Sequence, residues 1–198
     1  MVPSVVGFLL FGDVMASLLF ERGRFTHDDS RYVWMVLSGS AVGLIATTVG
    51  RFYASAFYAM GDTKTPARFA YIRIGLVIVL GVIFGLGIPH AFGLELRFGT
   101  AGLTLSAGIA GWVEFALLRR ALKALIDDFA VPVSFMARCW VVAIVAAALA
   151  TGLRWALPEH NRILRDLEIL VVFGVLYLGG AVVAGAITIQ ELRRRLRV

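Results

Sequence analysis

AFYAMGDTKTPAR, residues 56–68, joins two apolar segments that are each long enough to cross a lipid bilayer. Both flanking segments are soluble in lipid, whereas the polar turn between them has to lie in water. The residues of that turn are Gly61, Asp62, Lys64 and Pro66. The stretch therefore predicts a helical hairpin that turns at a membrane surface, and its cations predict that this surface is the cytoplasmic one.

The chain as a whole has the composition of a membrane protein. Its 198 residues are 60% hydrophobic, and its mean hydropathy is +0.86. Stretches of about 20 apolar residues cross the ~30 Å hydrocarbon core as helices, and these stretches do not alternate with the two-residue period of a barrel strand. We expect six spans: Val2–Phe20, Tyr32–Arg51, Phe69–Pro89, Thr100–Leu118, Phe135–Leu157 and Leu167–Gln190. The predicted fold is an all-α, polytopic membrane helix bundle with short loops.

The basic residues favour one orientation of this bundle. The sequence pI of about 10.1 would suggest a nucleic-acid partner in a soluble protein, but here the Lys and Arg residues lie near the ends of apolar spans. With the N-terminus inside, most of the 19 cations fall on the inner side, including Lys64, Arg68, Arg119, Arg120 and Lys123. Cytoplasmic loops carry such an excess. We therefore expect both termini in the cytoplasm, membrane lipids as partners and no nucleic acid.

No constellation of catalytic or metal-binding residues is visible in the sequence. The three histidines fall in separate loops, and no spacing of Cys, His and carboxylates suits a metal. The run THDDS, residues 26–30, holds Ser, His and Asp together, but a catalytic triad is defined by spatial geometry and not by adjacent letters. We interpret Asp28 or Ser30 as the N-cap of the second span. The chain is expected not to be an enzyme and to use no cofactor.

Four ionisable residues inside the predicted spans form the candidate site. Each such residue costs roughly 2.5–3.5 kcal/mol at mid-bilayer, which makes it a functional candidate by default. Arg73 and Glu114 lie at a similar depth on the third and fourth spans, and Arg51 lies somewhat deeper on the second. Asp13 lies near the middle of the first span. We predict that Arg73 and Glu114 approach within salt-bridge or one-water distance.

Two interpretations of these four residues remain open. Arg51, Arg73 and Glu114 form either the polar wall of a substrate cavity or gate, or a neutralising pair with an arginine that snorkels to the inner headgroups. Asp13 has no obvious partner at its depth in this chain. It therefore faces either a water-filled cavity or a cation from protein outside this chain.

Two glycine pairs, Gly39 with Gly43 and Gly81 with Gly85, have the small-xxx-small spacing that lets helices approach closely. With 21 glycines in the chain, this spacing arises easily by chance. We interpret both pairs as sites of ordinary helix packing and not as a dimer interface.

Three blocks of sequence carry a resemblance to a known family. They are LLFERGRFTHDDS at 18–30, GRFYASAFYAMGDTKTPAR at 50–68 and GTAGLTLSAGIAGWVEFALLRRAL at 99–122. The chain resembles the C-terminal portion of the lipid II flippase family (MurJ, also MviN), within the multidrug/oligosaccharidyl-lipid/polysaccharide exporter superfamily. The blocks are similar to the outer loop after the family's ninth helix, to the end of its tenth helix with the following inner turn, and to its twelfth helix. The second block is fairly specific.

The resemblance implies part of a fourteen-helix fold, in which two six-helix lobes are followed by two appended helices. Residues 1–123 would be the last four helices of the second lobe, and residues 124–198 the appended pair, which is implicated in a groove for the long lipid tail. The family carries lipid II, the undecaprenyl-pyrophosphate-linked peptidoglycan precursor, from the inner to the outer leaflet by alternating access. The resemblance thus implies a transporter of the bacterial cytoplasmic membrane that serves peptidoglycan biosynthesis, cell-wall organisation and cell shape.

The chain also departs from the family's pattern. The family's cavity arginines lie mainly in its first helices and its eighth, which have no counterpart here. The stretch IRIGLVIVLGVIFGLG, residues 72–87, has no Asp, Asn or Thr for the sodium site of some members, so no ion site is expected. We expect a fragment that is inactive alone and whose partner is the set of missing N-terminal helices of the same protein. The alternatives are an exporter of another polyprenyl-linked glycan or drug, and a stand-alone structural or regulatory membrane subunit without transport.

Overall fold

The computed structural model describes residues 1–21, 25–93, 95, 98–126, 133–156 and 162–185. Its elements are α1 (Val2–Phe20), α2 (His27–Ala59), α3 (Lys64–Val82), the π-helical turn η1 (Ile83–Gly87), α4 (Ile88–Ala91), α5 (Gly99–Lys123), α6 (Val133–Ala156) and α7 (Arg162–Val183). Because α3, η1 and α4 form one continuous helical stretch, the described residues contain six helices that are long and apolar enough to cross a membrane. The predicted all-α bundle with six spans is confirmed.

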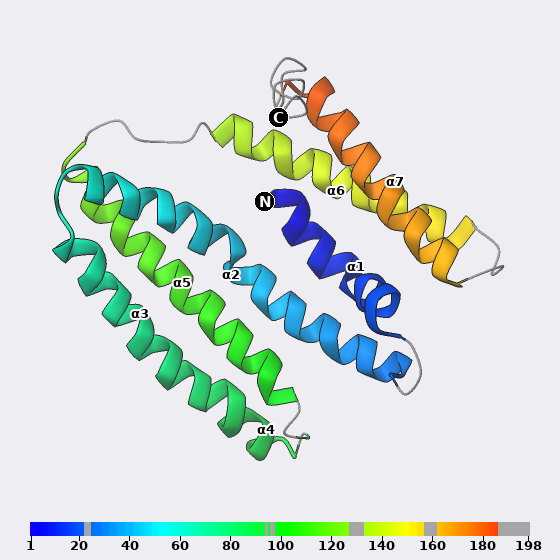
Figure 1. The fold of residues 1–198 in the computed structure, drawn as a ribbon, viewed down its shortest axis with the longest axis horizontal. Helices are drawn as coiled ribbons and strands as arrows, with labels where there is room; N and C mark the ends of the chain where they lie inside the picture. Colours follow the sequence, from blue (N-terminus) through cyan, green and yellow to red (C-terminus); the bar gives the residue numbers. More distant parts are fainter. Residues whose placement is uncertain (22–24, 94, 96–97, 127–132, 157–161, 186–198) are drawn as a thin grey trace.

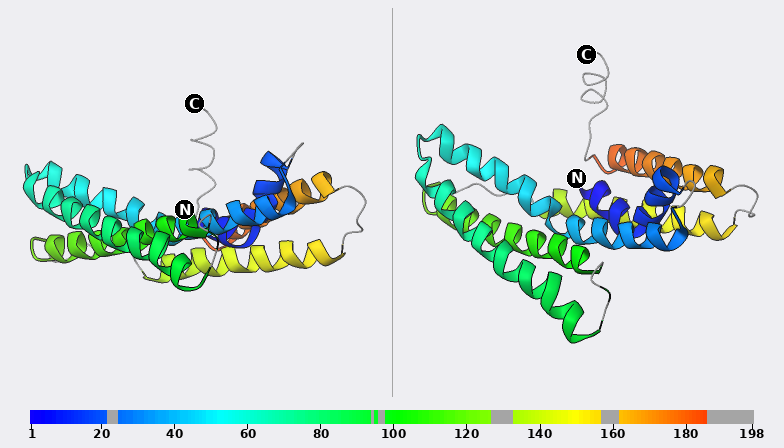
Figure 2. Two further views of the ribbon diagram at one scale, coloured as in Figure 1. Left: turned by 90° about the horizontal axis from the view of Figure 1, so that it is seen from below. Right: turned by 60° about the horizontal axis from the view of Figure 1, so that its bottom comes forward.

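The helices lie side by side in the order α3, α5, α2, α1 and α6, with α7 beside α6 (Figure 1). The largest interface joins α2 to α5, and the next largest joins α1 to α2. Seen edge-on in Figure 2, these helices form a shallow layer with α6 along one side of it. The α2–α1 contact therefore connects a group made of α2, α3 and α5 to a group made of α1, α6 and α7.

Glycines let α2 and α5 pack backbone to backbone. A Cβ added at Gly43 would overlap the Cα of Gly108, and a Cβ added at Gly39 would also collide with α5. The indole N–H of Trp112 donates to the carbonyl oxygen of Val42 at 2.7 Å and so ties the same two helices. The interpretation of Gly39 and Gly43 as a packing site is confirmed.

The second glycine pair has the same function between α3 and α5. A Cβ added at Gly81 or at Gly85 would come within 3.1 Å of side-chain atoms of Leu103 on α5. This distance is tighter than an ordinary van der Waals contact, so a larger residue at either position would require the Leu103 side chain to shift. The packing interpretation is confirmed here as well.

Small residues on α6 bring α1 and α7 together around an apolar core. The buried cluster consists of Val6, Phe11, Val14, Ala143, Ala146, Ala147, Ala150, Ile169 and Phe173. The ring centroids of Phe11 and Phe173 are 5.2 Å apart, a contact that contributes about 0.5–1.5 kcal/mol beyond the area it buries. Four alanines on one face of α6 leave room for these two rings, which explains why α1 packs on the last two helices.

The second span is longer at both ends than the sequence predicted. We expected residues 32–51, whereas α2 runs from 27 to 59. The added residues at the start, 27–31, are polar. The added residues at the end, 52–59, are mostly apolar, and Tyr53 and Phe57 are buried there against Leu118 and Leu122 of α5. The predicted end at Arg51 was therefore wrong because the charge of one residue does not end a helix whose next turns pack on a neighbouring helix.

The start of α2 corrects the expected N-cap. Thr26 is the N-cap, and neither Asp28 nor Ser30 occupies that position. The carboxylate of Asp29 accepts hydrogen bonds from the backbone N–H and the hydroxyl of Thr26, both at 2.8 Å. The spacing of Thr26 and Asp29 is that of a capping box with Asp at the third helical position, a signal that the sequence did contain.

The sixth span also begins earlier than predicted. The expected range was 167–190, whereas α7 runs from Arg162 to Val183. The predicted end at Gln190 lies outside the described residues. The earlier start brings charged residues into the helix, and one of them belongs to a contact described below.

Candidate functional site

The hairpin turn between α2 and α3 is built on backbone hydrogen bonds that Gly61 permits. Gly61 has a φ of +77°, a left-handed conformation that glycine adopts without strain. The N–H of Asp62 donates to the carbonyl oxygen of Phe57, and the N–H of Gly61 donates to that of Tyr58, both at 3.0 Å. This pair of bonds is a Schellman motif, which ends a helix. The side of the membrane that holds the turn stays a prediction.

The side chain of Asp62 caps the first turn of α3, which begins at Lys64. Its Oδ1 accepts hydrogen bonds from the backbone N–H groups of Lys64 and Thr65, both at 3.0 Å, which satisfies two free donors of the first helical turn. Pro66 lies in the same turn, where its missing N–H costs no hydrogen bond. Hydrogen bonds from the side chain and backbone of Thr65 hold the pKa of Asp62 below its ordinary value of 3.8, with smaller contributions from the Lys64 backbone and the charge of Arg68.

An ion pair joins α3 to α5. Nη1 of Arg73 donates to Oε2 of Glu114 at 3.1 Å, which confirms the predicted approach of these two residues. Both lie within membrane-spanning helices, where an uncompensated charge is costly, so each side chain stabilises the charge of the other. The side chain of Glu114 is 16% exposed and that of Arg73 is 38% exposed. The guanidinium therefore keeps N–H donors that can reach a further anion.

Arg51 and Asp13 lie apart from this pair. Arg51 is exposed on α2, and among the described residues the structure records no ion pair for it. Asp13 is half-buried on α1, which packs mainly against α2, α6 and α7. Asp13 has an interaction partner within the chain, so the expectation that this chain offers it none is wrong. A cavity or gate function for these four residues stays a prediction.

Asp166 is a buried carboxylate that lies just before the predicted sixth span, Leu167–Gln190. Its residue is 3% exposed on α7, and its Oδ2 accepts a hydrogen bond from Ser17 Oγ at 3.2 Å. Because a buried carboxylate needs polar partners, this contact ties α7 to α1. Hydropathy missed it since the apolar run starts at Leu167. The available signal was the four-residue spacing of Asp13 and Ser17, which places two polar residues on one face of α1.

An open apolar groove of about 440 Å³ lies between α6 and α7. The residues that line it include Val141, Val145, Leu149, Leu176, Gly180 and Val183. A Cβ added at Gly180 would lie 2.7 Å from Cγ1 of Val142, so this glycine sets how closely the two helices approach. A groove with this lining suits a hydrocarbon chain, because it offers apolar contact and no charged group.

These features define a class of protein: a multi-pass α-helical membrane protein that keeps a few polar contacts between its spanning helices. Within the part of the chain that the structure describes, no group of three or more His, Cys, Asp or Glu side chains is placed to hold a metal ion. The sequence pattern of the family described as lipid II flippase MurJ matches residues 1–164. The chain belongs to this family.

Curated relatives support the assignment and set its extent. The probable lipid II flippase MurJ of Rhizobium meliloti is 25% identical over an alignment of 206 positions, which covers 98% of this chain and 36% of that protein. The lipid II flippase MurJ of Burkholderia cenocepacia is 28% identical over 188 residues, or 89% of this chain and 34% of the relative. The probable lipid II flippase MurJ of Vibrio cholerae is 29% identical over 121 residues, or 61% and 21%. The chain thus spans 21–36% of the length of these relatives.

Proposed function

We propose that this chain is part of a transporter that moves lipid II, a lipid-linked peptidoglycan precursor, from the inner to the outer leaflet of the bacterial cytoplasmic membrane by alternating access. The observation that carries the proposal is the match of residues 1–164 to the lipid II flippase MurJ family. Because the chain spans about a third of two of these relatives, we expect it to transport only in combination with the other helices of such a protein. Both chain termini lie in the cytoplasm in this proposal.

The proposed contact with the substrate's pyrophosphate is made by the arginines. Arg73 is partly exposed, and Glu114 holds its guanidinium in place while leaving donors unused. A guanidinium binds phosphate oxygens through charge-assisted, often bidentate hydrogen bonds. In this proposal Arg73 and the exposed Arg51 contact the pyrophosphate, and Glu114 is a positioning residue. Asp13, on another part of the bundle, faces the transport path from α1.

The proposed contact with the polyprenyl tail is made by the groove between α6 and α7. Its lining is apolar throughout the residues that the structure describes there. Burial of apolar surface contributes about 25 cal/mol per Å², so a long tail laid along such a groove adds affinity without any polar contact. Residues 1–123 and 124–198 would then contribute separately, the first to the transport lobe and the second to holding the tail.

Replacement of a segment in a relative tests this function. Residues 1–198 would substitute for the matching segment of the Burkholderia cenocepacia relative, in a bacterial strain depleted of its own flippase. We expect the chimera to restore growth and the appearance of lipid II on the outer leaflet, and the chain alone to restore neither.

The outcomes separate the candidate functions. A chimera that inserts stably but leaves lipid II on the inner leaflet contradicts the proposal. Export of a different lipid-linked glycan by the same chimera would favour a sister transporter. Rescue by a truncated relative that lacks the segment matching this chain would favour a structural or regulatory function for this chain.

A further inference from the structure

The helical stretch Lys64–Ala91 changes its hydrogen-bond pattern at η1. The N–H of Ile88 donates to the carbonyl oxygen of Ile83, five residues back, which is a π-type bond. Pro89 follows directly and has no N–H, so the carbonyl oxygen of Gly85, four residues before it, has no α-helical donor. In a regular α-helix the proline ring would also collide with that carbonyl. The wider π turn relieves the collision, so the sequence itself places the break here.

The contact of η1 with α5 is made by backbone at two glycines of α5 and by the side chain of Leu103, which packs on Gly85. A Cβ added at Gly99 would overlap the carbonyl oxygen of Gly85, and a Cβ added at Gly102 would overlap that of Phe84. The two glycines of α5 therefore touch the carbonyl oxygens of η1 with no side chain of their own between the two backbones. With Leu103 as the side chain recorded against Gly85, the contact has little of the ridge-into-groove packing that fixes the angle between two helices.

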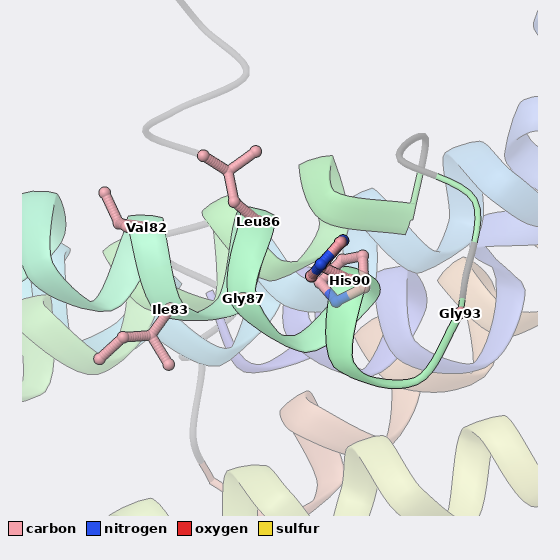
Figure 3. Close-up of a pocket in the computed structure, with 7 residues that line it drawn as sticks. Val82, Ile83, Leu86, Gly87, His90 and Gly93 are labelled. Carbon is pink, nitrogen blue, oxygen red and sulfur yellow. The ribbon is translucent and has the colours of Figure 1, made fainter.

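The opposite side of η1 is open. A cavity of about 740 Å³ lies against residues 82–93, with Val82, Leu86 and His90 among its lining. Figure 3 shows the side chains of Val82, Ile83, Leu86 and His90 projecting from the one continuous helical stretch. Among the described residues, the turn thus has α5 on one side and this cavity on the other, so bending toward the cavity meets no other helix of that part of the chain.

α4 has few contacts with other helices. It continues directly from η1, and the described residues give it no comparable contact with another helix, although Pro89 is buried. The span to which α4 belongs, Lys64–Ala91, is also the least buried of the six, with 11% of an 18-residue stretch buried against 22–39% in the other five spans. Segments with few packing contacts move at a low free-energy cost.

We propose that η1 is a hinge about which α4 bends relative to α3. The inference rests on the proposed function in one respect, because alternating access requires spanning segments to change position between two states, and a hinge is one way to do so. The sequence positions that make the hinge are Pro89, which removes the donor, and the glycines at 85 and 87, which tolerate the changed backbone. Bending at η1 moves His90 and Phe92 while Lys64–Val82 stays packed on α5.

Distances between spin labels test the hinge in the full chain reconstituted into lipid vesicles. Cys139→Ser first removes the single native cysteine. Phe92→Cys and Ile78→Cys then place labels beyond and before η1, at residues that are 76% and 62% exposed. Each is paired with Ala116→Cys, which lies at an exposed position of α5. We expect the distance distribution of the Phe92 pair to be at least about twice as wide as that of the Ile78 pair. Equal widths would overturn the inference.

Substitutions in and next to η1 supply a second test, and a substitution on α3 supplies the control. Pro89→Ala restores the missing N–H, and Gly87→Ala fits because its added Cβ would lie 3.8 Å from the nearest neighbour, the carbonyl oxygen of Val82. Both favour a regular α-helix, so we expect the Phe92 distribution to narrow to the width of the Ile78 pair. Gly75→Ala is the matched substitution on α3, where a Cβ meets nothing within 4 Å, and should leave the width unchanged.

The hinge proposal and the transport proposal are tested by different measurements, so each can fail without the other. An unchanged width in Pro89→Ala would overturn the hinge, provided that the Ile78 pair keeps its distance and so reports an intact fold. The measurement needs no substrate. A rigid η1 therefore leaves the flippase proposal standing, and a chimera that fails to flip lipid II leaves the hinge standing.

Discussion

Among single residues, the depth of a charge in the membrane follows from the sequence, but its partner follows only in part. Counting residues at 1.5 Å each from the ends of their spans places Arg73 and Glu114 at a similar depth, and the packing of α3 on α5 brings them to 3.1 Å. The same counting left Asp13 without a partner and began the sixth span after Asp166, although both residues have partners in the folded chain. The faces that α1 and α7 turn toward each other decide the contact of Asp166 with Ser17, and the depth of a single residue does not contain that information.

Exchanging the charges of the Arg73–Glu114 pair separates its two interpretations. We expect Arg73→Glu or Glu114→Arg alone to lower the free energy of unfolding by about 1–2 kcal/mol, less than for a fully buried pair because Arg73 is 38% exposed. The double exchange should restore the stability, measured by denaturant titration in micelles. If the pair only neutralises charge, lipid II flipping recovers as well. If Arg73 contacts pyrophosphate, flipping stays about tenfold or more below the wild-type rate, since the charge now sits on the other helix.

Failure of the double exchange to recover stability would show that the pair does not couple α3 to α5. The three variants are all measured in the chimera used for complementation, so stability and transport refer to the same protein.

The cap formed by Asp62 predicts a pH dependence of the hairpin turn. The folded state lowers the pKa of this carboxyl group from its ordinary 3.8, chiefly through hydrogen bonds from Thr65. The charged carboxyl group of Asp62 therefore stabilises the turn fully at a pH above its pKa in the unfolded state. This stabilisation is lost as the pH falls through the lower pKa that the group has in the folded state. We expect the carboxyl carbon-13 shift of Asp62 to titrate below pH 3.8 and the amides of Lys64 and Thr65 to lose protection over the same range.

The control for this titration is Asp62→Asn, which keeps a side-chain oxygen but has no charge to lose. Its amide protection should not depend on pH in that range. A carboxyl group that titrates at or above 3.8 would contradict the capping bonds.

Among helices, the number and type of elements follow from apolar length, whereas their ends and irregularities do not. Each of the six spans appears where the hydropathy places it. The capping box at Thr26, the extension of α2 to Ala59 and the π turn at η1 depend on hydrogen bonds outside the apolar pattern. Pro89 and the glycines before it did carry a signal for the break, but Pro near a helix end is also compatible with a simple stop.

The close packing of α2 on α5 predicts that two glycine substitutions differ strongly in their effect on the free energy of unfolding. Gly43→Ala should lower the free energy of unfolding by about 1–3 kcal/mol, because the new Cβ overlaps the Cα of Gly108 and forces the helices apart. Gly174→Ala adds a Cβ that meets nothing within 4 Å, and should be neutral or stabilising by up to about 1 kcal/mol, since Ala favours a helix over Gly. Denaturant titration of both variants in micelles measures the difference. An equal effect of the two would mean that α2 and α5 do not touch at Gly43.

Across the whole molecule, two groups of helices meet along α1 and α2 in a shallow layer (Figure 2). A layer leaves large apolar faces uncovered, for example on α3, where Tyr71 is 74% exposed and Ile78 62% exposed. In a membrane such faces contact lipid or further helices. The proposal that the chain transports together with other helices is consistent with this shape.

If the polyprenyl tail binds in the groove between α6 and α7, larger side chains in the groove should lower the affinity for lipid II. Val145→Trp and Leu149→Trp enlarge side chains at positions 51% and 56% exposed within the groove. If the polyprenyl tail lies there, displacing about 60 Å² of apolar contact costs about 1.5 kcal/mol, or roughly a tenfold loss of affinity for lipid II. Binding of lipid II and of a short-tailed analogue would be compared, and the loss should be confined to the long tail.

Val171→Trp is the matched control for the groove. It introduces the same side chain on α7 at a position that is 55% exposed and is not among the residues that line the groove. It should leave lipid II binding unchanged. Equal losses in all three variants, or no loss in any, would place the tail elsewhere.

The amino-acid sequence alone predicts six membrane-spanning helices, a hairpin turn near Gly61 and the four charges within the spans that form the candidate site. These properties follow from the transfer free energy of each residue and from local backbone preferences, which are fixed by residues close together in the chain. Only the tertiary structure shows which helices are neighbours, that Asp166 is buried against Ser17, and that an open groove lies between α6 and α7. Those outcomes depend on close contact between surfaces far apart in sequence, such as the bare backbones at Gly43 and Gly108, and no local property of the chain specifies which surfaces will fit.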